Sequence, residues 1–70
     1  MENERHNLME EIIKEMFRKR TNLSVPDNII GLLVDENMED TLLLNERELV
    51  DYLHSNEVII GKINRITKLL

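Results

Sequence analysis

Apolar residues recur along most of the chain with the spacing of an amphipathic helix. In residues 4–20 they return every three or four positions, while charged residues occupy the opposite side. Acidic residues near the start and basic residues near the end of this segment match the helix macrodipole. The pattern predicts a helix over 4–20 that stops at Asn22, a residue that tolerates the left-handed conformation found after helices.

A second apolar segment predicts a buried helix that begins at Ser24. A serine hydroxyl is a common N-cap, and Pro26 fits the first turn of a helix. The apolar residues from Ile29 to Val34 cover more than half of the helix circumference, so we expect this helix to be the most buried. We expect it to end in the acidic stretch 35–40.

The C-terminal part of the chain predicts two further helices. Asn45 and Glu48 have the spacing of a capping box, which predicts a third helix that runs to about His54. Ser55 and Asn56 indicate a break, and the isoleucines that follow recur at helical spacing, which predicts a fourth helix over 57–70.

The preceding segment 41–44 stays ambiguous between a buried connector and a helical turn. The predicted fold is therefore all-α: one domain over residues 1–70, built as a small three- or four-helix bundle with a helix-turn-helix-like C-terminal half.

Composition narrows the class of protein. A chain of 70 residues with 41% hydrophobic residues is long enough for one small core, which buries about 60% of the unfolded surface. The absence of cysteine excludes disulfides and cysteine-ligated zinc. Since no apolar run exceeds four residues, we expect no membrane span and no signal peptide, and a cytoplasmic location.

The net charge of −5 is unevenly distributed. Residues 58–70 carry +3 and no acid, which leaves −8 on residues 1–57. Within that part, four acidic residues crowd six positions: Asp35, Glu36, Glu39 and Asp40. An acidic surface favours solubility, and it also favours a basic partner while disfavouring nonspecific binding to nucleic acid.

These features indicate a small acidic interaction or regulatory protein that binds and modulates a larger macromolecule. The expected partner is a protein, with a basic one favoured by the charge. We expect the contact to be the acidic group at 35–40 or an apolar stripe formed by Ile59, Ile63 and Ile66. The absence of Ala and Gln and the scarcity of Gly and Pro suggest an AT-rich genome, such as that of a low-GC bacterium or its phages, and a phage or mobile element is one origin we expect.

An alternative hypothesis is a DNA-binding transcriptional regulator, because residues 49–66 resemble the helix-turn-helix pattern. Residues 54–56 would form the turn, and the second helix would present four polar or basic residues to a DNA groove: Lys62, Asn64, Arg65 and Lys68. The sequence departs from that pattern at Val50, His54 and Ile59, where small, glycine and polar residues are usual.

A homodimer is a further expectation, because residues 49–70 also fit a heptad register with Leu49, Asn56, Ile63 and Leu70 at one core position. A continuous helix over this range favours a dimer through that stripe. A break at 55–56 would make the register a coincidence.

Metal and catalytic sites find little support in the sequence. Residues 35–46 have partial spacing of an EF-hand calcium loop, but Asp40 stands where the turn requires glycine. Asp51, His54 and Glu57 are three positions apart and could share one side of a helix, but without a second histidine they would form a poor metal site. We therefore expect no enzyme activity, no bound metal and no cofactor.

Overall fold

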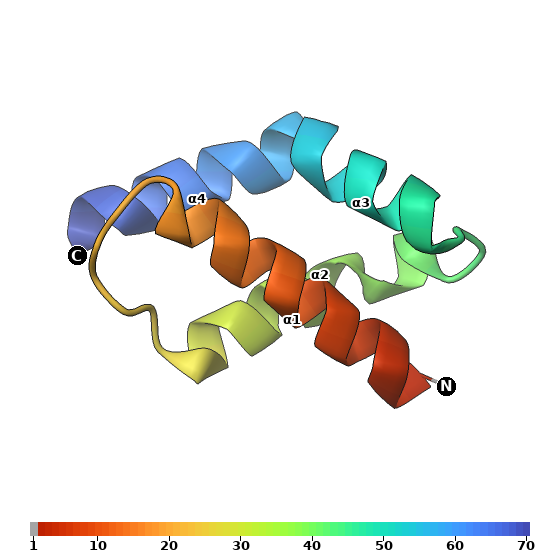
Figure 1. Cartoon of the computed structure of the whole chain (residues 1–70). Helices are drawn as coiled ribbons and strands as arrows, with labels where there is room; N and C mark the ends of the chain where they lie inside the picture. The colour runs from red at the N-terminus through yellow and green to blue at the C-terminus, as the bar shows by residue number, and fades with distance from the viewer. Residues whose placement is uncertain (1) are drawn as a thin grey trace.

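The computed structural model describes the backbone of residues 2–70 and the side chains of residues 4–70. Within this range the chain forms four α-helices and no strand (Figure 1). Their bounds are α1 Glu2–Arg18, α2 Asp27–Thr41, α3 Glu46–Ser55 and α4 Glu57–Leu69. The predicted all-α fold with four short helices is confirmed.

Helix α1 lies at the centre and contacts each of the other three helices. Its buried side includes Met9, Ile13 and Phe17, as the apolar spacing of the sequence predicts. The other helices close over this side with their own apolar residues: Ile30, Leu33, Val34, Leu49, Leu53, Ile59 and Ile63. The fold is thus a small bundle in which α2, α3 and α4 each pack against α1 and enclose one core.

The predicted junction between α1 and α2 was wrong at both ends. Helix α1 ends at Arg18, and the backbone N–H groups of the next three residues donate hydrogen bonds to the carbonyls of Glu15 and Phe17. No described non-glycine residue has a positive φ, so Asn22 does not supply a left-handed stop. Helix α2 starts only after Pro26, because proline disfavours the helical conformation in the residue before it, and Ser24 does not cap the helix.

The predicted end of α2 was also wrong, because the helix continues through the acidic stretch to Thr41. The Asn37 side chain donates a hydrogen bond to the Leu33 carbonyl (2.8 Å), and the Thr41 hydroxyl donates to the Met38 carbonyl (2.9 Å). Thr41 is completely buried and anchors the last turn. Residues 35–41 are therefore helical, which excludes the EF-hand loop.

The predicted start of α3 is confirmed. The Asn45 side chain accepts a hydrogen bond from the Glu48 backbone N–H (2.8 Å), and the Glu48 carboxylate accepts one from the Asn45 N–H (3.0 Å). The break is also confirmed, since Asn56 lies between α3 and α4 in an extended conformation and caps α4. Residues 49–70 are therefore two helices, and the heptad register was a coincidence.

Within residues 2–70, none of the four helices combines the length and the apolar character that a membrane span requires.

Candidate interaction surface

Helix α2 carries a charge equal to that of the whole chain. It contains five carboxylates and no basic residue, while the chain as a whole has a net charge of −5. Four of these carboxylates lie in the last two turns, at the negative end of the helix macrodipole: Asp35, Glu36, Glu39 and Asp40. The effect of the macrodipole is limited to the last turn, where it disfavours Glu39 and Asp40 by a few tenths of a kcal/mol each. Local preferences that are violated in this way are typical of functional surfaces.

The charge at this helix end is partly offset by Arg5 of α1. Its guanidinium donates one hydrogen bond to the Thr41 carbonyl (2.7 Å) and another to the Leu44 carbonyl (2.6 Å). The Thr41 carbonyl is one of the last carbonyls of α2, which have no partner within the helix, and Leu44 lies in the turn that follows. Arg5 thus caps α2 from a neighbouring helix, a role that the sequence pattern did not reveal.

The side of α2 that faces solvent also carries two large apolar residues. Leu32 is 61% exposed, and Leu43, just after the end of the helix, is 99% exposed. Glu36 and Glu39 follow Leu32 at four and seven positions, so they lie on the same side of the helix. We call Leu32, Asp35, Glu36, Glu39 and Leu43 the acidic face.

The four predicted acidic contact residues are all exposed, but they differ in their neighbours. Asp35 accepts a hydrogen bond from His6 of α1 (3.1 Å), and Glu36 forms an ion pair with Lys62 of α4 (2.7 Å). Glu39 and Asp40 form no ion pair with any side chain of residues 4–70. These two carboxylates are therefore the ones most available to a partner.

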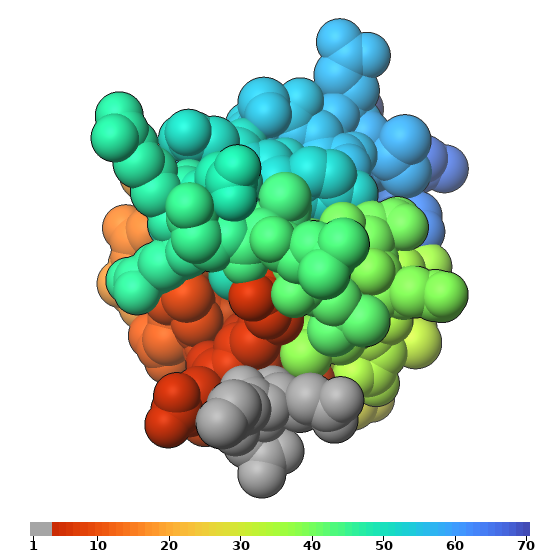
Figure 2. Space-filling model, turned by 90° about the vertical axis from the view of Figure 1, so that its right-hand side faces the viewer, coloured from red at the N-terminus to blue at the C-terminus, as the bar shows by residue number. Residues whose placement is uncertain are grey.

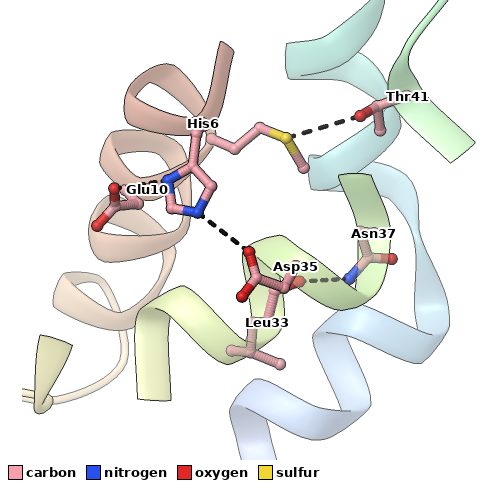
Figure 3. Close-up of polar contacts among 7 residues, drawn as sticks. His6, Glu10, Leu33, Asp35, Asn37 and Thr41 are labelled. Atoms are coloured by element: carbon pink, nitrogen blue, oxygen red, sulfur yellow. Dashed lines mark hydrogen bonds and ion pairs between the residues drawn. The ribbon is translucent and has the colours of Figure 1, made fainter. Parts of the chain in front are cut away.

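The imidazole of His6 joins α1 to the acidic face. Its Nδ1 lies 2.9 Å from the Glu10 carboxylate, and its Nε2 lies 3.1 Å from the Asp35 carboxylate (Figure 3). The hydrogen bond with Glu10, more than that with Asp35, raises the pKa of His6 above its ordinary value of 6.5. Protonation of His6 thus strengthens the contact between α1 and α2.

The predicted apolar stripe is not an accessible surface. Ile59 and Ile63 are buried in the core, and Ile66 is half-buried against it. In the helix-turn-helix pattern, Ile60 would face inward and Ile59 outward, but Ile59 is the more buried of the two. With two adjacent isoleucines, the sequence allows either one to face the core. In the structure, where α4 contacts α1, Ile59 is the one buried in the core.

Two of the four residues predicted to contact nucleic acid already contact other side chains of the chain. Lys62 is paired with Glu36, and the Asn64 side-chain oxygen accepts a hydrogen bond from Arg20 Nε (2.9 Å). Arg65 and Lys68 are exposed and form no ion pair among the described side chains. A DNA-binding surface on α4 would therefore require these existing contacts to be exchanged.

One open pocket of the described surface combines charged and apolar residues. An open groove of about 420 Å³ lies where the end of α1, the following loop and the start of α2 meet. Its charged residues include Lys14 and Asp27, whose charged atoms are 3.9 Å apart. Within the described part of the chain, no three His, Asp or Glu side chains converge on a common point that suits a metal ion, and this includes Asp51, His54 and Glu57.

Comparisons with protein-family models, with curated proteins and with solved structures give no match for this chain.

Proposed function

We propose that this protein is a small interaction and regulatory protein that binds a basic segment of a larger protein through the acidic face of α2. The observation that carries the proposal is the placement of Leu32 and Leu43, both more than half exposed, on either side of Glu39. Binding would cover the basic segment of the partner and in this way modulate the activity of the partner. The cytoplasmic location stays a prediction from the sequence.

The two kinds of residue on the acidic face contribute differently. Complete burial of a leucine side chain contributes roughly 1.5–3 kcal/mol, so Leu32 and Leu43 supply affinity. The carboxylates attract a basic partner and orient it, which contributes mainly to the association rate and to specificity. The unfavourable placement of acids at the end of α2 is then explained by binding rather than by folding.

Binding of DNA by α4 is the alternative, and it has less support. Its basic residues lie beside the carboxylates of α2, and the Glu36–Lys62 ion pair brings one of these carboxylates to 2.7 Å from a proposed phosphate contact. A carboxylate in this position repels phosphate. The alternative predicts salt-dependent binding to duplex DNA at about 50 mM salt that weakens in Arg65→Ala and Lys68→Ala. Absence of duplex binding by the folded protein would remove it.

The proposal is tested with a fluorescent amphipathic peptide of leucine and lysine, and with a matched peptide of leucine and glutamate. Fluorescence anisotropy should show that the wild type binds only the lysine peptide. Glu39→Lys should weaken binding about tenfold, equivalent to about 1.4 kcal/mol. Glu11→Lys makes the same charge change on the exposed side of α1 and should have little effect.

A second pair of variants tests the apolar contribution. Leu32→Ala should weaken binding of the lysine peptide, whereas Leu23→Ala should not, although Leu23 is similarly exposed in the loop before α2. Equal binding of the two peptides, or equal loss in both leucine variants, would contradict a specific docking surface on α2.

A further inference from the structure

Helices α2 and α4 lie beside each other on the side of the molecule away from α1. Figure 1 shows α1 in front of both, and in Figure 2 α1 lies at the lower left while α2 and α4 lie at the lower and upper right. The Glu36–Lys62 ion pair, 2.7 Å long, joins them. The two helices run in opposite directions along this face (Figure 1).

The exposed side of α4 has the chemical pattern that the acidic face would bind. Val58 is 66% exposed and Leu69 is 86% exposed, and they are separated by the same eleven positions as Leu32 and Leu43. Within α4 this separation corresponds to about three helical turns, or about 16 Å, whereas Leu43 lies in the turn just after α2. We call Val58, Lys62, Arg65 and Leu69 the basic face.

The two faces are complementary in charge and in apolar character. The acidic face carries Glu36 and Glu39 between Leu32 and Leu43, and the basic face carries Lys62 and Arg65 between Val58 and Leu69. In an antiparallel arrangement these two carboxylates therefore lie over the two bases, and apolar residues lie at both ends.

From this complementarity we infer that the acidic face of α2 binds the basic face of α4 in a second copy of the chain. The inference rests on the proposed function, because it uses the same binding surface, for which a second copy then competes with the larger partner. Since α2 and α4 are antiparallel neighbours, a two-fold axis parallel to them places α2 of each copy on α4 of the other. The Glu36–Lys62 pair within each chain is then exchanged for pairs between the copies. The contact is therefore made twice, as in an isologous dimer.

The size of this surface sets the expected strength of the dimer. Two helices of 13 and 15 residues form a face about 20 Å wide and about 20 Å long. This is smaller than the area of about 800 Å² per partner that is typical of stable complexes. We therefore expect a dissociation constant on the order of 10–100 µM. The net charge of each copy opposes association, but physiological salt screens it beyond about 8 Å.

The test is sedimentation equilibrium of the full chain at about 10–500 µM, a range chosen to bracket that constant. Two double variants reverse one face each: Glu36→Lys with Glu39→Lys, and Lys62→Glu with Arg65→Glu. Each double variant alone should be monomeric, because like charges then face each other. An equimolar mixture should restore association at least to the wild-type level, whatever the register, because both contacts are again between opposite charges.

Control variants separate the faces from net charge and from folding. Glu11→Lys with Asp51→Lys changes the net charge as much as reversal of the acidic face does, on exposed positions of α1 and α3, and should still dimerise. Leu32→Ala leaves all charges and the core unchanged and should be monomeric. Circular dichroism checks that each variant is folded. If a charge variant is unfolded, the oligomeric state of Leu32→Ala decides whether the chain dimerises through the acidic face.

A wild type that stays monomeric up to about 500 µM would overturn the inference. A mixture of the two reversed variants that stays monomeric would also overturn it. If the wild type is monomeric but still binds the leucine–lysine peptide through Glu39, only the homodimer fails and the proposed function stands. If this peptide does not bind either, the proposed function fails as well.

Discussion

Arg5 fastens the C-terminal end of α2 to α1, and its substitution tests how that acidic helix end is stabilised. The guanidinium donates to the carbonyls of Thr41 and Leu44, 36 and 39 positions away in the sequence, over 2.7 and 2.6 Å. It also places a positive charge at the negative end of the helix macrodipole. Arg5→Ala removes both interactions without creating a cavity in the core, since Arg5 is only half-buried.

The expected loss follows from these contacts. A hydrogen bond from a charged donor contributes roughly 1.5–3 kcal/mol, and a cation near a helix C-terminus about 0.3–1 kcal/mol. Water can replace part of both bonds at a half-buried position, so Arg5→Ala should lower the free energy of unfolding by about 2–3 kcal/mol. A domain of this size has only about 4–10 kcal/mol in total, and its melting temperature should fall by roughly 10–20 °C.

Urea and thermal denaturation followed by circular dichroism measure this loss. Arg5→Lys keeps the charge but cannot present two parallel donors, so about half of the loss should remain. Arg47→Ala is the control, because Arg47 is exposed and makes no ion pair with the described side chains, and such changes stay within about 0.5 kcal/mol. A loss below about 0.5 kcal/mol in Arg5→Ala would refute the capping role.

Three further variants test other parts of the fold by urea denaturation. Gly31→Ala should raise the free energy of unfolding by about 0.5–1 kcal/mol, because an added Cβ meets nothing within 4 Å; a decrease would indicate a constraint on this turn of α2. Asn45→Ala should lower it by about 1 kcal/mol through loss of the capping box, and an unchanged value would show that the cap contributes nothing. The raised pKa of His6, caused first by Glu10, makes its stabilisation complete below pH 6.5, and this stabilisation disappears as the pH rises through the raised pKa. Wild type should therefore gain stability over His6→Gln between about pH 8 and pH 6, and a constant difference would contradict the bridge to Glu10 and Asp35.

The sequence by itself determined the features that depend on neighbours within one turn. The capping box of Asn45 and Glu48, the break at Asn56 and the buried side of α1 follow from residues three or four positions apart. Local chemistry also misled where two local signals competed. Ser24 has the preferred side chain of an N-cap, but the restriction that Pro26 imposes on its predecessor moves the helix start past it.

Tertiary structure decided the features that depend on distant segments. Helix α2 extends through its acidic end because Arg5 caps it and Thr41 is buried beneath α1, and neither contact leaves a local pattern in the sequence. The same packing chose Ile59 over Ile60 for the core and left Leu32 in solvent, although the periodicity of each helix allowed other choices. Helical spacing defines which residues share a side, but only the neighbouring helices decide which side is covered.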